Sequence, residues 1–583
     1  MPTQENQPHS ALTRAAGLFA VLIVARLLTL DGSRIPISLW TAPAYLWQDV
    51  AAAMVFAIVD YIVRRDWFGW TLYGVLVGYV ALNVPIARVL SSPLTLPMIR
   101  ATGGPLSDSI RYYITLKNVG AIALVTIIGA VLPIGFARWR PRRAAIIAVF
   151  AAGLAIVAPG PYAISKVDTA GRYRNALGAL WPVRAAGPAK RAGTTNWRTS
   201  PFPPPASPSN ELLQYRGSAA GRNVVIVSLE SAASRYWPGF NGMDPMPNLT
   251  AFADRVLVFE HAYAVYPESI KGLFSVLCSR YPAFNVPAET LSGSACVSFA
   301  GELGKAGYRT ALFHSGRFMY LGMPAVIENR GFEILEDAGA IGGEVHSSFG
   351  VDDQSTVKRM LEWIDSLKPG ERFFVTYLPV AGHHPYATPK PGPFVGNDEF
   401  GRYLNALHYG DEALGQLLDG LHGRRLDNNT LFIFFGDHGE AFGQHEGNFG
   451  HTLFIYGENI HVPYIIAAPG LIREKLRIAK AVSLIDTAPT ILDLLGLPIP
   501  PDYEGTTMLD PQPRMSLFFT DYSLGFLGLY DSCWKYIFET NSQHSKIYDV
   551  CKDPDELRDL SGSETKRAAA YRSRLEEWFD AIR

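Results

Sequence analysis

Long apolar stretches fill the first third of the chain, and shorter ones alternate with polar residues in the remainder. Five apolar segments lie at about residues 12–30, 44–63, 69–87, 118–137 and 144–164. Each approaches the ~20 residues that an α-helix needs to cross the hydrocarbon core of a bilayer. A signal peptide would be a single short apolar segment. The pattern therefore predicts a transmembrane domain of about five helices over residues 1–165.

Arginines in the short connections predict how these helices are oriented. Arg64 and Arg65 lie between the second and third segments. A second cluster lies between the fourth and fifth segments, at Arg138, Arg140, Arg142 and Arg143. Short basic loops stay on the cytoplasmic side. We therefore expect the N-terminus inside and everything after the fifth helix outside.

Three ionisable residues, Arg26, Asp49 and Asp60, lie within or near the ends of the apolar segments. A charge in lipid is costly, so such residues face one another, reach to the interface or serve a function. The sequence favours pairing between helices or contact with the interface, and it does not assign the partners.

The remaining residues alternate strand and helix patterns. Residues 223–229, 373–378 and 431–435 are continuous runs of β-branched and aromatic residues, as in strands buried on both faces of a parallel sheet. Helical patterns lie between them, for example at 354–367 and 403–422. This alternation predicts an α/β domain over residues 222–583 with a mainly parallel central sheet.

A connector is predicted between the two domains, over residues 166–221. It ends near the proline-rich run 201–205, which favours an extended, semi-rigid spacer. Such a spacer would hold the α/β domain near the outer surface of the membrane.

Composition narrows the class of protein. The chain has 52 basic and 53 acidic residues, a net charge of −1, without the basic excess that is typical of nucleic-acid binding. Charged residues make up 18%, below the ~25% of soluble domains. The four cysteines are too few for a disulfide scaffold. Cys278 with Cys296 and Cys533 with Cys551 could form two local disulfides in an oxidising compartment, although other pairings stay open.

Polar residues follow three of the predicted strands. Glu230 follows the first, His383 and His384 follow the second, and Asp437 and His438 follow the third. Ligands of α/β sheets collect beyond the carboxyl ends of strands. Carboxylate and imidazole groups gathered there make a candidate metal site.

Several longer motifs resemble a known family. They are NVVIVSLES (223–231), MPNLTAFA (246–253), FFGDHGEAFGQHEG (434–447), HVPYIIAAPG (461–470), SLIDTAPTILDLLGLPIPPDYEG (483–505) and KIYDVCKDPDELRDL (546–560). Together they resemble the sulfatase-like branch of the alkaline phosphatase superfamily. The resemblance covers almost all of residues 222–562, in the expected order. It implies that family's α/β fold.

The nucleophile segment departs from the sulfatase pattern. Sulfatases oxidise a cysteine or serine to formylglycine within C/S-x-P-S/A-R, and an R-Y-P-like segment follows. Here Ser269-Ile270-Lys271-Gly272-Leu273 occupies the signature, and Arg280-Tyr281-Pro282 follows it. The proline and arginine that the modifying machinery reads are absent. The resemblance therefore implies that Ser269, and not Cys278, is the nucleophile, as an unmodified hydroxyl suited to phosphoryl chemistry.

The metal ligands that the resemblance implies are Glu230, Ser269, Asp437 and His438. Sulfatases open with two aspartates and bind calcium through oxygen ligands alone, whereas this chain has Glu230-Ser231 and a histidine nitrogen. Calcium prefers six to eight oxygens, and a mixed oxygen and nitrogen set suits tetrahedral zinc or manganese. We expect one divalent metal, Zn or Mn.

This variant pattern resembles membrane-anchored transferases: lipoteichoic acid synthase, the phosphoglycerol transferase of periplasmic glucans and the lipid A phosphoethanolamine transferases. The resemblance implies transfer of a phosphoglycerol or phosphoethanolamine head group from a membrane phospholipid to an envelope glycan or lipid, through a covalent Ser269 intermediate. It also implies a multi-pass protein of the bacterial inner (cell) membrane, with its C-terminal domain in the periplasm.

Histidines are the candidates for proton transfer, because a leaving alkoxide needs an acid and an acceptor hydroxyl needs a base near neutral pH. His383, in the family's H-x-P setting, and His451 are the predicted catalytic histidines. His384 is assigned to substrate binding, and His445 is a lower-ranked neighbour. Structural hydrogen bonding is the alternative for each of them.

Three further residues are candidates for binding the substrate. Arg317 could hold a phosphate oxygen, because a guanidinium matches phosphate bidentately, and His314 lies close by in sequence. An ordinary loop ion pair is the alternative for both. Lys271 could supply the positive charge that the sulfatase arginine provides.

Two other functions remain open. One is a hydrolase of the same fold, a phosphodiesterase or sulfuric ester hydrolase, in which water replaces the acceptor. The other is a catalytically idle, lipid-sensing regulator, which would have no need of all four predicted metal ligands. The sequence leaves open the donor head group, the acceptor, the metal and the oligomeric state.

Overall fold

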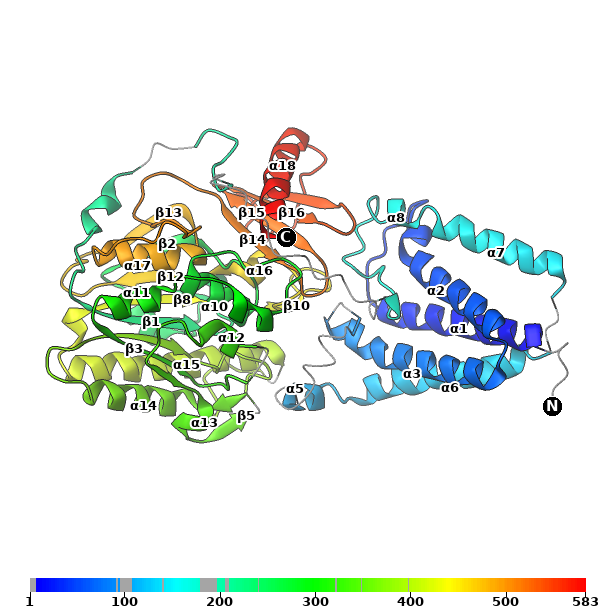
Figure 1. The fold of residues 1–583 in the computed structure, drawn as a ribbon, viewed down its shortest axis with the longest axis horizontal. Helices are drawn as coiled ribbons and strands as arrows, with labels where there is room; N and C mark the ends of the chain where they lie inside the picture. The colour runs from blue at the N-terminus through cyan, green and yellow to red at the C-terminus, as the bar shows by residue number, and fades with distance from the viewer. Residues whose placement is uncertain are drawn as a thin grey trace.

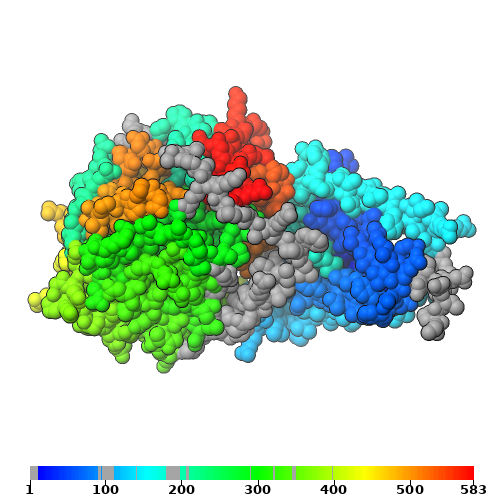
Figure 2. All heavy atoms as spheres, viewed as in Figure 1, coloured from blue at the N-terminus to red at the C-terminus, as the bar shows by residue number. Residues whose placement is uncertain are grey.

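Two bodies of secondary structure follow one another in the computed structural model, a helical one and an α/β one (Figure 1). In the space-filling view the helical body, blue to cyan, adjoins the larger α/β body, green to red (Figure 2). The structure describes residues 7–90, 93–94, 107–138, 141–178, 197–204, 209–239, 241–319, 322–347, 349–396 and 398–583.

Among its described residues, the helical body has five helical segments that are long and apolar enough to cross a membrane, the fifth of which runs from Arg143 to Ala163, and this confirms the predicted five-helix arrangement. The long helices are α1 (Gln7–Thr29), α2 (Thr41–Val63), α3 (Asp66–Leu90), α6 (Leu116–Phe136) and α7 (Arg143–Val157). The short helices α5 (Ser107–Tyr112) and α8 (Gly160–Ala163) lie at the end of this body that faces the α/β domain (Figure 1). Leu18, Val77 and Val125 are among the buried side chains where α1, α3 and α6 pack together.

The ionisable residues of the spans are paired between helices. Arg26 of α1 binds Asp49 of α2 with an Nε–Oδ2 distance of 2.7 Å. Arg14 of α1 binds Asp60 of α2 at 2.8 Å, and both side chains are almost fully buried. Because an unpaired charge in this setting is strongly unfavourable, each pair fixes α1 against α2. Pairing is thus the correct interpretation for Arg26, Asp49 and Asp60.

The α/β body is built on a nine-stranded sheet of order β11-β2-β12-β8-β1-β7-β3-β4, with β13 paired to β2. Its strands are β1 (Asn223–Leu229), β2 (Val256–Tyr263), β3 (Tyr308–His314), β4 (Ile334–Glu336), β7 (Arg372–Leu378), β8 (Thr430–Gly436), β11 (His461–Val462), β12 (Tyr464–Ala467) and β13 (Leu476–Ser483). The adjoining strands β8, β1, β7, β3 and β4 are parallel, and β12 is antiparallel to both β8 and β2. The predicted mainly parallel sheet is confirmed.

Helices cover both faces of this sheet. Along β1, Val224 and Ile226 point into the layer that contains α10 (Ser269–Cys278), α11 (Phe299–Lys305) and α17 (Thr487–Leu494). Val225 and Val227 point into the opposite layer, which contains α9 (Pro247–Phe252), α14 (Asp353–Asp365) and α15 (Glu399–Gly423). β1, which is apolar from Val224 to Val227, is therefore buried on both faces.

A small antiparallel sheet completes the domain. Its strands are β14 (Ser516–Thr520), β15 (Phe526–Asp531), β16 (Trp534–Glu539) and β17 (Ser545–Asp549), and the C-terminal helix α18 (Thr565–Ile582) packs against it. Disulfides join Cys278 to Cys296 and Cys533 to Cys551, the two local pairings that the sequence suggested. Cys278 is thereby excluded as a nucleophile.

Parts of the predicted connector belong to the packed α/β domain. Arg198 is buried and binds Asp486 with an Nη2–Oδ2 distance of 2.6 Å. Leu212 and Tyr215, from the short 3-10 helix Glu211–Tyr215, join the core under the sheet. The segments 197–204 and 209–221 are therefore fastened to the domain, while residues 179–196 and 205–208 of the predicted spacer lie outside the described residues.

We expect Asp60→Asn to destabilise the helical body by about 3 kcal/mol, because it removes the buried charge partner of Arg14 and leaves only Asp66, which is 40% exposed, to pair with the guanidinium. Replacing both residues by leucine should recover most of this loss. Heat denaturation of the purified full chain in detergent measures the effect. The control is Asp31→Asn, whose carboxylate is 66% exposed and pairs with Arg88. An Asp60→Asn protein that unfolds like the wild type would refute the role of this pair.

Candidate active site

Two neighbouring parallel strands bring the principal carboxylates together. In the β1–β8 register, Leu229 lies opposite Gly436, so the residues that follow, Glu230 and Asp437, lie side by side. Both are buried, at 8% and 7% exposure. The adjacent His438 is fully buried, and its Nε2 lies 3.7 Å from Glu230 Oε1 and 3.4 Å from Asp437 Oδ2. The sequence prediction that these strand ends form one site agrees with this geometry.

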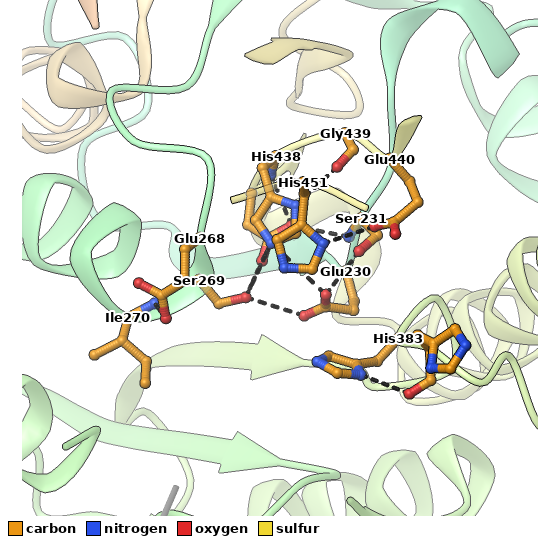
Figure 3. A network of polar contacts seen from close by, with 12 residues as sticks. Glu230, Ser231, Glu268, Ser269, Ile270, His383, His438, Gly439, Glu440 and His451 are labelled. Carbon is orange, nitrogen blue, oxygen red and sulfur yellow. Dashed lines mark hydrogen bonds and ion pairs between the residues drawn. The ribbon is translucent and has the colours of Figure 1, made fainter. Parts of the chain in front are cut away.

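Ser269 points into this cluster from the first position of α10 (Figure 3). Its Oγ lies 2.7 Å from Asp437 Oδ2, and 3.2 Å from both Glu230 Oε2 and His438 Nε2. Glu268 caps the helix by accepting hydrogen bonds from the backbone N–H groups of Ile270 and Lys271. The cap fixes where α10 begins and thereby aims the Ser269 hydroxyl at the two carboxylates.

Ser231 holds the two carboxylates in place. Its N–H donates to Asp437 Oδ1 at 3.0 Å and its hydroxyl donates to Glu230 Oε1 at 2.9 Å. Ser231 has a φ of 55°, in the left-handed region that non-glycine residues rarely adopt. Such strain is typical of functional sites, where the surrounding structure compensates for it.

The two buried carboxylates, Glu230 and Asp437, favour binding of a cation between them. Burial and the nearby Asp437 raise the pKa of Glu230 to about 8. Burial lowers the pKa of His438, but Asp437 and Glu230 outweigh burial and raise it to about 8. Two buried carboxylates this close repel each other unless a proton or a cation lies between them.

The donor set fits a divalent metal ion. Ligand atoms of Glu230, Asp437 and His438 all lie within 4.8 Å of one another. His438 Nδ1 lies 3.0 Å from the Gly439 carbonyl, to which it donates, so that Nε2 carries the lone pair toward the carboxylates. The Ser269 hydroxyl supplies a fourth donor. These are the four residues that the sequence predicted as ligands.

A second group of hydrogen-bonded polar side chains lies beside the cluster of Glu230, Asp437 and His438. This group was not predicted from the sequence. His451 stacks on His438 with ring centroids 4.0 Å apart, and its Nδ1 lies 2.7 Å from Glu440 Oε2. The other oxygen of Glu440 accepts a hydrogen bond from the Tyr386 hydroxyl at 2.8 Å. Burial alone would raise the pKa of Glu440, but His451 holds it at about 2. The signal in the sequence was Glu440 itself, two residues after His438.

His383 lies on the other side of His451, with ring centroids 6.2 Å apart. Its Nδ1 lies 2.9 Å from the His384 carbonyl, and burial lowers its pKa to about 3, so it is neutral at pH 7. Asp353 of α14 anchors the loop before it by accepting hydrogen bonds from the N–H groups of Val380 and Ala381. The structure therefore brings both predicted catalytic histidines to the same edge of the sheet.

The predicted substrate-binding residues have different surroundings. His314 ends β3, and its Nδ1 lies 3.0 Å from the carbonyl of Leu378, which ends β7. Arg317 follows β3, and its side chain lies near Gly339 of the short helix α13 (Ala338–Ile341). The ammonium of Lys271 binds both oxygens of Asp521, at 2.8 and 3.0 Å. That ion pair ties α10 to the C-terminal part of the domain.

The loops around the site face the helical body. Tyr113, just after α5, stacks on His384 with ring centroids 5.6 Å apart, and its hydroxyl donates to Glu399 at 3.2 Å. Arg172, after the last span, binds Glu446 at 2.6 Å in the loop that leads to His451. The carboxyl edge of the sheet is therefore turned toward the apolar helices.

Family models match most of the α/β domain. The Sulfatase model matches residues 222–497, and the N-sulphoglucosamine sulphohydrolase C-terminal model matches residues 445–581. Arylsulfatase K of Mus musculus is 26% identical over 237 residues, which cover 36% of this chain and 42% of that protein. The lipoteichoic acid synthase-like protein YvgJ of Bacillus subtilis is 24% identical over 300 residues, which cover 48% of each chain. The chain thus spans less than half the length of these relatives.

Solved structures share the fold. The lipoteichoic acid synthase LtaP of Listeria monocytogenes superposes with a TM-score of 0.53 and 21% identity, covering 63% of this chain and 94% of the other. An alkaline phosphatase superfamily protein of Vibrio parahaemolyticus gives a TM-score of 0.51 and 20% identity, covering 66% and 94%. Sulfatase and alkaline phosphatase superfamily enzymes use a divalent metal, and Glu230, Asp437 and His438 form a candidate binding group for one. Residues 222–497 thus belong to the Sulfatase family, and the α/β domain has the fold of lipoteichoic acid synthase LtaP and of the alkaline phosphatase superfamily protein.

Proposed function

We propose that this protein transfers a phosphoglycerol or phosphoethanolamine head group from a membrane phospholipid to an envelope glycan or lipid. The observation that carries the proposal is the Ser269 hydroxyl, held between Glu230, Asp437 and His438 on the sheet edge that faces the apolar helices. Without the proline and arginine of the sulfatase signature, serine keeps its hydroxyl and is suited to attack phosphorus. The similarity to lipoteichoic acid synthase-like proteins supports the same reaction.

The proposed setting is the inner membrane of a bacterium. The two arginine clusters place the N-terminus in the cytoplasm, and the α/β domain then lies in the periplasm. The two disulfides suit an oxidising compartment. In this arrangement the donor lipid lies in the same bilayer as the helices that contact the active-site loops.

In the first half-reaction, Ser269 Oγ attacks the phosphorus of the lipid. A Ser269–phosphorus bond forms, the bond from phosphorus to the diacylglycerol oxygen breaks, and diacylglycerol leaves. Asp437 Oδ2, 2.7 Å from Oγ, is placed to accept the serine proton. When bound by Glu230, Ser269, Asp437 and His438, a zinc or manganese ion would lower the pKa of the hydroxyl and neutralise phosphoryl charge.

In the second half-reaction, an acceptor oxygen bonds to phosphorus, the Ser269–phosphorus bond breaks, and Ser269 Oγ recovers its proton from Asp437. In the first half-reaction the departing diacylglycerol oxygen needs a proton, and in the second the attacking acceptor hydroxyl must lose one. His451 suits both steps, because its Nδ1 is held by Glu440 and its Nε2 is left to exchange a proton. His383, neutral at pH 7, is the second candidate and lies beside it.

A hydrolase is the second candidate function, favoured by the match to arylsulfatase K and to the sulphohydrolase C-terminal model. Water would then take the place of the acceptor. An idle lipid-sensing regulator would show neither a covalent intermediate nor turnover. The experiments below separate the three functions.

Incubating the purified, metal-loaded protein with phosphatidylglycerol or phosphatidylethanolamine should add one phospho-head-group to the protein and release diacylglycerol. Intact-mass measurement detects the adduct and identifies the donor. Ser269→Ala should abolish both signals. Ser275→Ala on the same helix, whose hydroxyl bonds only to the Lys271 carbonyl among the described residues, is the matched control.

Absence of an adduct and of diacylglycerol with both lipids would refute the transferase. Hydrolysis of a sulfate or phosphate ester by that same preparation would then favour the hydrolase. Inactivity toward both substrate classes would favour the regulator. Formation of an adduct that decays only after a glycan or lipid acceptor is added would separate a transferase from a phosphodiesterase.

Removal of divalent metal should lower the melting temperature of the wild-type protein, and zinc or manganese should restore it, because a ligand that binds only the folded state stabilises it. At a metal concentration of about 100 times Kd the gain is roughly 2.7 kcal/mol. Asp437→Asn and His438→Gln should lose the metal-dependent shift. His422→Gln, on an exposed histidine, should keep it. A shift of equal size in all four proteins would contradict the assigned ligands.

Glu440→Gln should reduce turnover by about 10²-fold, in the lower range of general acid–base effects, because the amide no longer holds the His451 proton donor in place. Metal binding, measured by the melting-temperature shift, should be retained. His451→Gln should cause a loss of similar size, and the double variant little more, since the two residues act as a unit. Strictly additive losses would show that Glu440 acts separately from His451.

A further inference from the structure

Two tyrosines in the connection between the third and fourth spans contact an active-site loop of the α/β domain. Tyr112 ends α5, and Tyr113 follows it. The Tyr113 ring stacks on His384 with an interplanar angle of 9° and ring centroids 5.6 Å apart. Tyr112 packs edge-on against the same imidazole at 5.4 Å. Tyrosines of the helical body therefore contact the residue next to His383, a proposed proton-transfer group.

Hydrogen bonds fix the backbone of Tyr113 to the start of the fourth span, α6. Its N–H donates to the Ile110 carbonyl at 3.2 Å, and its carbonyl accepts from the Thr115 N–H at 2.9 Å. The same carbonyl accepts from the side-chain amide of Asn118, in the first turn of α6, at 2.8 Å. The Thr115 hydroxyl in turn caps α6 by accepting from the Asn118 N–H. The position of the Tyr113 ring is therefore set by a span.

The first turn of α15 holds the same two tyrosines from the α/β side. The Tyr113 hydroxyl donates to Glu399 Oε1 at 3.2 Å. The Tyr112 hydroxyl accepts from Arg402 Nη2 at 2.8 Å, and the Arg402 guanidinium lies 4.9 Å from the centre of the Tyr112 ring. Two polar contacts and two ring contacts thus join the connection to the α/β domain.

The orientation of His383 depends on its neighbour His384. His383 Nδ1 lies 2.9 Å from the His384 carbonyl. A carbonyl oxygen only accepts, so Nδ1 carries the proton and Nε2 carries the lone pair. The His384 ring is held by Tyr113 of the helical body and by Tyr386 of the α/β domain, which packs edge-on at 5.3 Å. A shift of His384 would therefore turn the His383 ring.

We propose that Tyr113 is a positioning residue for the transfer reaction: its stack on His384 fixes the loop that carries His383. Offset or parallel aromatic contacts stabilise one relative geometry, and a proton-transfer group acts only when its geometry is held. The inference rests on the proposed function, and it adds a contribution from the helical body to a site whose other residues belong to the α/β domain. Tyr113 itself acts through His384.

The first test is the rate of diacylglycerol release by the full-length, metal-loaded protein in a single turnover, with phosphatidylglycerol and with phosphatidylethanolamine. Tyr113→Ala should lower the maximal rate about tenfold, since a displaced group in an active site slows the reaction. The half-saturating lipid concentration should stay unchanged. Tyr113→Phe keeps the stacked ring and loses only the bond to Glu399, so it should keep most of the rate.

The second test needs no turnover. Hydrogen exchange followed by mass spectrometry reports the loop 380–387, because the N–H groups of His383 and Tyr386 donate to carbonyls within it. Exchange of this segment should be at least about threefold faster in Tyr113→Ala and unchanged in Tyr113→Phe. Tyr61→Ala, on a tyrosine of α2 that is 51% exposed, is the matched control and should exchange like the wild type. An equal metal-dependent rise in melting temperature in all four proteins excludes a general loss of folding.

Unchanged exchange of the loop in Tyr113→Ala would overturn the proposal, whether or not either lipid reacts. Faster exchange with an unchanged rate of diacylglycerol release would overturn it too, because the loop would then move without consequence for the reaction. An equal loss of rate in Tyr113→Phe would assign the effect to the Glu399 bond and not to the stack. A wild-type protein that releases no diacylglycerol would refute the transfer reaction, while the exchange result still decides whether Tyr113 holds the loop.

Discussion

The proximity of Glu230 and Asp437 is the constraint on which the site depends. Adjacent parallel strands in register place these carboxylates next to each other in a buried position, where like charges repel. The surrounding residues compensate: Ser231 donates to both carboxylates, and His438 and Ser269 supply further partners. The proposed divalent cation would bind this preorganised negative cluster, and Ser269, whose Oγ lies 2.7 Å from Asp437 Oδ2, is the proposed nucleophile.

A second layer of contacts positions the proton-transfer groups around that cluster. Tyr386 holds Glu440, and Glu440 holds His451, which stacks on the ligand His438. Asp353 anchors the loop before His383 from a separate helix. The metal site and the histidines therefore form one rigid unit, so a change in Glu440 alters the orientation of a histidine without touching the ligands.

The helical body contacts the loops around the active site at two places. Tyr113 packs on His384, beside His383, and Arg172 binds Glu446 in the loop before His451. Both contacts involve segments that leave or connect the spans. The arrangement brings the apolar helices next to the loops that surround Ser269.

The sequence by itself determined the periodic and local features. Apolar length predicted the five helices, continuous β-branched runs predicted the parallel strands, and the motif after β8 predicted the ligands Asp437 and His438. Cysteine spacing suggested two local disulfides but left other pairings open, and the structure forms the two local ones. These features depend on residues near in sequence or on rules of strand order, so they can be predicted from the sequence alone.

The tertiary structure decided which distant residues share one environment. Lys271 was expected near phosphate, but Asp521, 250 residues away, binds it instead. The sequence did not distinguish Glu440 from other acidic residues, and the structure shows that His451 and Tyr386 bind it. The pairing of Arg26 with Asp49 depends on the packing of α1 against α2. Side-chain partners depend on packing between segments far apart in the chain, and no local pattern records that packing.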